Sequence, residues 1–205
     1  MWDRKEKPWV FVLFLSPLIW LVYSLLSGRY FPDPAEPFMT LSGIWAGTFM
    51  CLSLTITPLT KKVKALKVLN RYRRFIGLAA FWYALLHLFA YLLLHAGFNL
   101  SWIQEDLLKR PYIYIGVLAF VILTALAITS PKAMVRKLGK RWKVLHKLTY
   151  VASLGILAHL WWQIKADSEI ALWFTPFLVI PLLFRINVKK SKIKSKNTCT
   201  KSVSH

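Results

Sequence analysis

Three histidines stand in strongly apolar stretches of the sequence, where burying an imidazole is costly without a function. His87 lies within FIGLAAFWYALLHLFAYLLLHAGF (75–98), and His146 and His159 lie within LHKLTYVASLGILAHLWW (145–162). Neither stretch contains a carboxylate, so the acidic groups that a proton relay or cation pathway would use are missing. Ionisable residues inside a membrane segment are functional candidates by default. Two facing imidazoles can bind a metal from opposite sides, and haem iron fits because it takes one imidazole on each face of an apolar ring.

Six apolar runs, nearly free of charged residues, are the elements that must position these histidines. They cover about 9–27, 38–60, 75–98, 111–131, 144–164 and 170–184. A helix needs about 20 residues to cross a membrane core of about 30 Å; the last run reaches that length by continuing past Arg185 to Val188. The composition, 57% hydrophobic and 18% charged, agrees. We predict an all-α membrane protein, a six-transmembrane-helix bundle over 1–188, with a basic, disordered tail over 189–205.

The basic residues alternate between the two sides of this predicted bundle. Of the 28 Lys and Arg, 24 fall in 1–8, 61–74, 132–147 and 185–201. The remaining connections, 28–37, 99–110 and 165–169, hold the other four and six of the eight acids. By the positive-inside rule, both termini are cytoplasmic. The sequence therefore predicts a multi-pass protein of a bacterial inner membrane, whose basic connections contact lipid and bind no nucleic acid.

The depth of each histidine follows from its distance to the basic inner end of its span. His87 lies twelve residues beyond Phe75 and His159 fifteen beyond Val144, which places them about 18 Å and 22 Å up. They match in depth within one helical turn, in the outer half of the membrane. We therefore predict that His87 and His159 are the axial ligands of one haem. His95, near the outer end, is expected only to make an interhelical hydrogen bond.

His146 lies near the inner surface and is a candidate ligand for an additional haem or another inner site. It is thirteen residues from His159, which separates the two by about 140° around an ideal helix and about 19–20 Å along it. They would share one face only if the helix bends, for which Gly155 is the candidate position. Fourteen residues before His87, where an inner partner for His146 would stand, the sequence has Arg73. One haem is therefore the expected count.

Other chemistry finds no support in the sequence. Cys51 and Cys199 form no CxxC motif, so iron–sulfur, zinc and thiol-redox sites lack their ligands. No GxGxxG or Walker loop is present. His205, at the end of the tail, is expected to be idle, and no internal repeat stands out. We predict no catalytic residues.

The pattern around His146 and His159 resembles the fifth span of the ferric-reductase-like transmembrane family. The residues that carry the resemblance are Trp142, Leu145, His146, Leu148, Tyr150 and His159 in RWKVLHKLTYVASLGILAHLWW. LNRYRRFIGLAAFWYALLHLFAYL (69–92) and the lack of a flavin or nicotinamide domain narrow it to haem-binding membrane subunits of bacterial methionine-sulfoxide reductase systems. The resemblance covers about residues 9–186. Arg73 departs from the two-haem relatives, which puts an inner haem in doubt.

This resemblance implies an electron-transfer subunit of an oxidoreductase, without a substrate-reducing site of its own. It implies haem b, carried by the matching residues His87, His146 and His159, and it also implies FMN. Electrons would come from the quinone pool or a cytosolic flavin reductase and pass to a periplasmic MsrP-like molybdenum reductase that repairs oxidised methionines. From charge alone, the guanidinium groups of Arg73, Arg74 and Arg141 are candidate inner-face contacts for a flavin or quinone.

Two other functions stay open at this point. The first is a stand-alone ferric or oxygen reductase cytochrome, which would use the same haem with a different outer acceptor. The second is a small transporter or assembly scaffold, in which the histidines would only hold helices together. Haem in the purified protein would separate the first two functions from the last, and the acceptor that reoxidises the haem would separate the first two.

Overall fold

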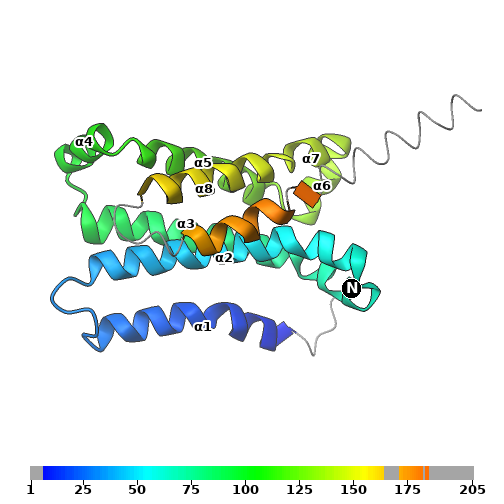
Figure 1. The fold of residues 1–205 in the computed structure, drawn as a ribbon, viewed down its shortest axis with the longest axis horizontal. Helices are drawn as coiled ribbons and strands as arrows, with labels where there is room; N and C mark the ends of the chain where they lie inside the picture. The colour runs from blue at the N-terminus through cyan, green and yellow to red at the C-terminus, as the bar shows by residue number, and fades with distance from the viewer. Residues whose placement is uncertain (1–6, 164–170, 182, 185–205) are drawn as a thin grey trace, which may run out of the picture.

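The computed structural model describes residues 7–163, 171–181 and 183–184, and these form helices joined by short turns, with no strand among them (Figure 1). The elements are α1 (Lys7–Leu26), α2 (Ala35–Lys62), the 3₁₀-helix η1 (Lys64–Arg71), α3 (Arg73–Ala90), the π-helical turn η2 (Tyr91–His95), α4 (Leu100–Lys109), α5 (Tyr112–Ile128), α6 (Lys132–Leu138), α7 (Lys140–Leu145) and α8 (Leu148–Gln163). A further apolar helix covers Ala171–Pro181. The predicted tail (189–205), Arg185 and the predicted connection 165–169 lie outside the described residues.

Each of the six predicted apolar runs coincides with a helix, so the all-α fold class is confirmed. Two helices are long and apolar enough to cross a membrane, Ala35–Lys62 and Arg73–His95, the second of which is α3 continued through η2. The bent pair of α4 and α5 makes a third if it is counted as one span. Phe11–Leu26 and Ala171–Pro181 are shorter apolar helices. The count of six spans and the cytoplasmic termini stay predictions.

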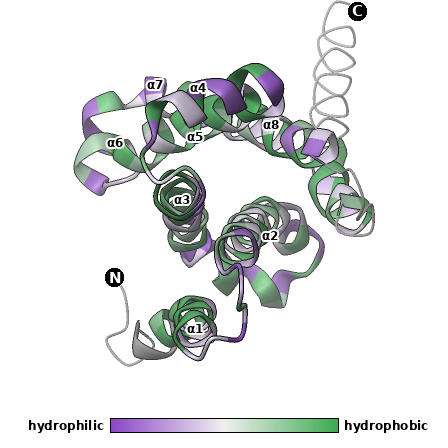
Figure 2. Cartoon of the chain, turned by 90° about the vertical axis from the view of Figure 1, so that its left-hand side faces the viewer, coloured by the Kyte–Doolittle hydropathy of each residue, from purple (hydrophilic) through white to green (hydrophobic). Residues whose placement is uncertain are grey.

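The outer faces of the helices are apolar (Figure 2). On α1, Leu13 and Ile19 are 68% and 63% exposed, and on α5 Leu118 and Val121 are also exposed. Soluble monomers rarely expose a contiguous apolar patch larger than a few hundred Å². These surfaces therefore suit contact with lipid.

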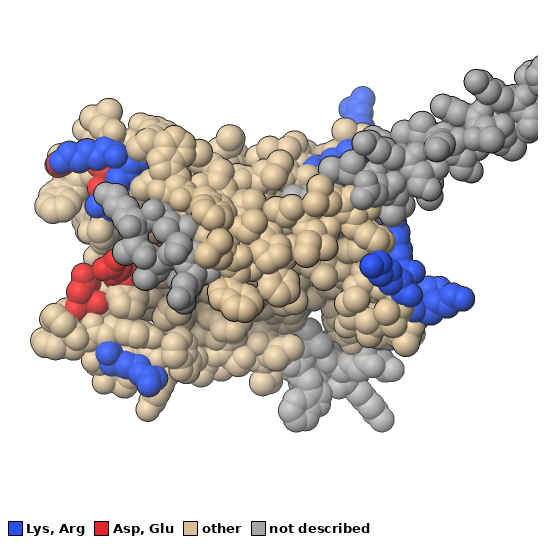
Figure 3. Space-filling view, in the orientation of Figure 1, with Lys and Arg blue, Asp and Glu red and all other residues tan. Residues whose placement is uncertain are grey.

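Charged side chains gather at the two ends of the bundle and leave its middle free on the face drawn in Figure 3. The connecting elements η1, α6 and α7 lie together at one end (Figure 1). The loop after α1 and helix α4 lie at the other end, where the acidic residues of this face are found (Figure 3). Connections of the same predicted side thus share one end, as the charge alternation in the sequence requires.

The helices are organised as two pairs. Helix α2 packs mainly against α3, and α5 mainly against α8, while α3 also touches α5. Small residues allow the close approach within the first pair, since Ala46, Ala79 and Ala80 are all buried. Helix α1 is attached to the first pair by the hydroxyl of Tyr83, which donates a buried 2.8 Å hydrogen bond to the carbonyl oxygen of Phe14. Any site between α3 and α8 therefore lies between the two pairs.

The segment 99–110, predicted as a plain connection, is largely the helix α4. The side-chain oxygen of Asn99 accepts hydrogen bonds from the backbone N–H groups of Ser101 and Trp102, which caps the helix. Helix α4 then meets α5 at an angle of 107°. Instead of a simple loop, a short helix lies across the end of the bundle that holds the acidic residues (Figure 1).

Candidate functional site

His87 of α3 and His159 of α8 face each other between the two helix pairs. Their ring centres are 6.4 Å apart, and the ring planes make an angle of 85°. Matched depth predicted that these two side chains are neighbours, and the structure brings them together. Both histidines are half-buried, and each is also contacted by the other helix of its own pair.

Each ring is held through its Nδ1 atom by a backbone carbonyl. The Nδ1 atom of His87 lies 2.8 Å from the carbonyl oxygen of Met39 on α2. The Nδ1 atom of His159 lies 2.8 Å from the carbonyl oxygen of Tyr112 on α5. Because a carbonyl oxygen can only accept, Nδ1 carries the hydrogen in both neutral rings and Nε2 carries the lone pair. This is the tautomer that binds metal through Nε2, and the N–H to carbonyl bond is the usual support of such a ligand.

The spacing of the rings suits a metal ion between them. A metal about 2 Å from each Nε2 atom, the ordinary metal–imidazole bond length, places two opposed ring centres about 6 Å apart. Within the described residues, no group of three or more His, Cys, Asp and Glu could hold a metal ion. The pair can therefore supply two ligands only, which is the number that haem iron takes from the protein.

Two glycines that the sequence analysis did not single out lie against the histidine rings. A Cβ atom on Gly43 would stand 3.0 Å from Nδ1 of His87, and one on Gly116 would stand 2.8 Å from Nδ1 of His159. The supporting carbonyls are backbone groups, so no residue type could have revealed them. Gly43 and Gly116 could have been noticed in the sequence, because glycine inside a helix is unfavourable and calls for a packing reason.

His95 lies apart from the pair, at the end of the bundle where α4 lies. Its Nε2 atom is 3.5 Å from the carboxylate of Asp106 on α4, and its ring stacks on Tyr91. Tyr91 and Arg110 contact the same carboxylate, at 3.3 Å and 3.4 Å. His95 therefore ties α4 to η2, in line with the interhelical contact that was predicted for it.

His146 lies at the opposite end, in the turn that joins α7 to α8. Its ring stacks on Trp142 with centres 4.0 Å apart, and its Nε2 atom is 3.3 Å from the hydroxyl of Thr129. The indole N–H of Trp142 donates to the backbone carbonyl of Thr129, at 3.0 Å. His146 is thus placed by α5 and α7, separately from the His87 and His159 pair.

The helix break between His146 and His159 lies close to His146. Helix α8 is continuous from Leu148 to Gln163, so Gly155 is not a helix break. It is a packing position instead, because a Cβ there would meet the side chain of Ala119 on α5 at 3.4 Å. The chain turns at His146 itself, which ends α7.

A cavity of about 500 Å³ opens beside His146. It is lined by basic side chains from three elements, namely Arg71, Arg73, Arg74, Lys143 and Lys147, and by polar groups that include Ser53, Asn70, Trp142 and Tyr150. None of the described residues that line it is acidic. The structure thus brings His146, Arg73 and Arg74 to one cavity. Arg141 is exposed on α7 and does not line it.

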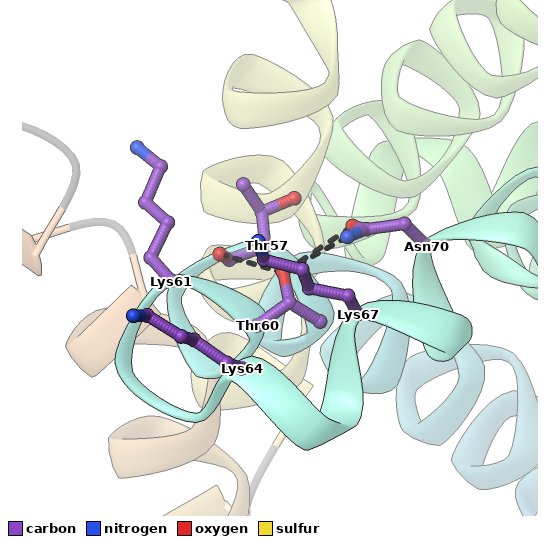
Figure 4. Close-up of a pocket in the computed structure, with 6 residues that line it drawn as sticks. All are labelled: Thr57, Thr60, Lys61, Lys64, Lys67 and Asn70. Atoms are coloured by element: carbon purple, nitrogen blue, oxygen red, sulfur yellow. Dashed lines mark hydrogen bonds between the residues drawn. The ribbon is translucent and has the colours of Figure 1, made fainter.

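A second cavity, of about 410 Å³, lies at the same end of the bundle between α2 and η1 (Figure 4). It is lined by Thr57, Thr60, Lys61, Lys64, Lys67 and Asn70. The amide of Asn70 donates to the hydroxyl of Thr60, at 3.2 Å. No histidine lines this cavity, and it shares Asn70 with the cavity beside His146.

The comparisons with known proteins agree with this arrangement. Residues 36–157 match the family model "Ferric reductase like transmembrane component". A protein of Polaromonas naphthalenivorans (strain CJ2), "Protein-methionine-sulfoxide reductase heme-binding subunit MsrQ", is 38% identical over 179 residues, which are 86% of this chain and 81% of that protein. Proteins with the same name from Brucella ovis and Brucella canis are 38% identical over 170 residues, 83% of this chain and 76% of theirs.

The matched region contains His87 and most of α2, α3, α5 and α8, and it ends two residues before His159. The match to the relatives covers most of the chain. The apolar outer faces and the long apolar helices agree with a membrane protein. The chain belongs to the ferric-reductase-like transmembrane family and, within it, to the MsrQ subunits.

Proposed function

We propose that this chain is the haem-binding, electron-transferring membrane subunit of a protein-methionine-sulfoxide reductase. The observation that carries the proposal is the facing pair His87 and His159, each with Nδ1 bonded to a carbonyl at 2.8 Å and each with Nε2 left for a metal. The names of the relatives support haem as the bound group. When bound, haem b supplies reversible one-electron transfer.

Two residues of the chain would hold this group. His87 and His159 would bind it through Nε2, and the carbonyls of Met39 and Tyr112 fix the tautomer of both rings. Among the described residues, no carboxylate contacts either ring, so neither imidazole has a local proton acceptor. The site is therefore suited to moving an electron without coupled proton chemistry.

Electrons enter, in this proposal, at the cavity beside His146. Its arginines and lysines would attract the phosphate of FMN or the headgroup of a reduced quinone. The size of about 500 Å³ lies within the usual range of 300–1,000 Å³ for ligand sites. Along α8 the cavity is about 14 Å from His159, because Tyr150, which lines it, lies nine residues before His159 at about 1.5 Å each.

The stacked pair of Phe81 and Phe120 lies between the entry cavity and the histidines. The ring centres are 5.9 Å apart and the planes differ by 15°. Phe81 stands one turn beyond Leu78 on α3, and Phe120 stands one turn from Leu123 on α5; both leucines line the cavity. Both rings are half-buried and place apolar groups between the two sites.

On the outer side, the proposed acceptor is a periplasmic MsrP-like molybdenum reductase. The proposed donors are the quinone pool or a cytosolic flavin reductase, at the inner surface of a bacterial inner membrane. A stand-alone ferric or oxygen reductase would use the same histidines, and the description of the matching family model favours it as the second candidate. The two functions differ only in the outer acceptor.

The test is the purified protein in detergent, with a reduced flavin or a quinol as donor. We expect a low-spin b-type haem that the donor reduces and that an MsrP-like subunit with methionine sulfoxide reoxidises. Reoxidation by ferric chelate or oxygen alone, with no response to the subunit, would favour the second candidate. Protein that contains no haem would contradict both and favour a transporter or scaffold.

A further inference from the structure

We propose that Gly43 and Gly116 are positioning residues that set the ring planes and the hydrogen bonds of His87 and His159. This inference rests on the proposed haem site. Each glycine is seated in the helix that supplies the carbonyl to the histidine, four residues after that carbonyl.

The reason lies in the geometry of the α-helix. The carbonyl of Met39 accepts the backbone N–H of residue 43 within α2, and it also accepts from two side chains, the hydroxyl of Ser42 at 2.8 Å and Nδ1–H of His87 at 2.8 Å. A helical side chain leans back over the turn that precedes it, so a side chain at 43 would cover the carbonyl at 39. Glycine at 43 leaves that carbonyl open, and His87 occupies the opening.

The contact distances show how completely the ring fills this space. A Cβ atom on Gly43 would lie 3.0 Å from Nδ1 and 3.2 Å from Cε1 of His87. On Gly116 the corresponding distances to His159 are 2.8 Å and 2.9 Å. The distances at Gly116 are shorter than real Cβ atoms essentially ever show, and those at Gly43 are tighter than nine in ten real Cβ contacts, so the ring beside Gly43 would have to give by a few tenths of an ångström. Alanine at either position must therefore push the imidazole away from its carbonyl.

The two arrangements are copies of one structural unit. Met39, Gly43 and His87 recur as Tyr112, Gly116 and His159, within one residue of a common separation along the chain. The same two ring atoms, Nδ1 and Cε1, meet the glycine in both cases. A chance packing gap would not reproduce the carbonyl, the glycine and the ring contact together. This repeated arrangement indicates that each glycine is needed for the hydrogen bond of its histidine.

These supports determine the electronic character of the ligands. The Nδ1–H to carbonyl bond raises the basicity of an imidazole ligand. Because a more basic ligand stabilises ferric iron, loss of the bond should raise the midpoint potential. Loss of such a partner commonly lowers metal affinity about 10–100-fold. The orientation of each ring also fixes the 85° angle between the two planes.

The experiment compares Gly43→Ala and Gly116→Ala with two matched controls in the full-length protein. Gly47→Ala, also on α2, crowds Phe174 at 3.0 Å, and Gly155→Ala, on α8, meets Ala119 at 3.4 Å; neither touches an imidazole. We expect at least a tenfold loss of haem affinity in the first two. Their remaining haem should show a changed low-spin electron paramagnetic resonance spectrum and a raised potential, while the controls stay as wild type.

The wild-type protein provides a measurement that does not depend on any variant folding. Nearly perpendicular imidazoles give a strongly anisotropic low-spin ferric signal, whereas parallel ones give an ordinary rhombic signal. A rhombic wild-type signal would overturn the inference, as would unchanged spectra and potentials in Gly43→Ala and Gly116→Ala, or equal changes in the controls. Wild-type protein without haem, or haem retained in His87→Ala, would instead overturn the proposed function.

Discussion

The rings of His87 and His159 stand at 85° to each other with their centres 6.4 Å apart, although the two residues belong to different helix pairs. Neither pair contains both ligands. The spacing of the rings is thus set by how α3 and α8 are placed across the bundle, while the direction of each ring is set inside its own pair by a carbonyl. A small change in the packing between the two helix pairs would therefore change the distance between the ring centres more than the orientation of either ring.

Replacement of either proposed ligand tests the site directly. We expect His87→Ala or His159→Ala to abolish low-spin haem binding, because the described residues place no other histidine at that level. His95→Ala is the control, since its ring contacts Asp106 and Tyr91 instead. Absorption spectra of the purified variants give the result. Haem lost in His95→Ala and retained in His87→Ala would show that the ligands are misassigned.

His146→Ala should have a graded effect. Its ring touches Trp142 and Thr129 and lines the basic cavity, away from the proposed axial pair. We expect a lowered content of haem or flavin, measured by absorption and by fluorescence of extracted flavin, with the haem signal still present. Complete loss of haem in a folded His146→Ala protein would place an axial ligand at this end of the bundle.

Arg73→Ala and Arg74→Ala should slow reduction of the haem without changing its spectrum. A hydrogen bond to a charged group contributes about 1.5–3 kcal/mol, so half-maximal reduction should need roughly 10- to 150-fold more donor. Stopped-flow reduction by quinol or reduced flavin measures this. Lys64→Ala, which removes a charge from the other cavity, is the control. Unchanged rates with lower expression would mean that these arginines only anchor the helix in lipid.

The orientation of the chain can be tested with a reporter. The basic residues of η1, α6 and α7 lie together at one end of the bundle, which predicts that this end is cytoplasmic. A reporter fused after the last residue should therefore be active in the cytoplasm, and one fused after Lys109 in the periplasm. The opposite result would invert the assignment of donor and acceptor sides.

Tyr83→Phe should loosen the attachment of α1. It removes the buried hydrogen bond to the carbonyl of Phe14 and leaves that oxygen without this donor. Bonds of this kind in membrane proteins contribute about 0.5–1.5 kcal/mol, so thermal unfolding in detergent should occur at lower temperature. Tyr114→Phe, at an exposed position of α5, is the control. Equal stability of all three proteins would show that α1 is held by apolar packing alone.

The sequence predicted the helices and the meeting of His87 with His159 because both follow from one-dimensional spacing. Apolar length locates a helix, and residues counted from a basic end give depth. It did not predict the helix break beside His146, where the ring stacks on Trp142, because that contact depends on how the folded chain turns there. It also missed helix α4, although Asn99 before an apolar stretch is a typical capping signal.

The supports of the histidines were missed for a different reason. The groups that bind Nδ1 are carbonyls, and every residue has one, so Met39 and Tyr112 carry no distinguishing side chain. Gly43 and Gly116 were visible, but their meaning depends on which ring lies opposite. The repeat that links them becomes visible only when the two helix pairs are compared in space.

The division into two helix pairs has a consequence for how the protein acquires its cofactor. Each pair orients its own histidine before the other pair is present, since the supporting carbonyl belongs to the same pair. Haem bound between α3 and α8 would then link the α2–α3 pair to the α5–α8 pair. The two helix pairs could then insert into the membrane one after the other. The last step of assembly would be their packing around haem between α3 and α8.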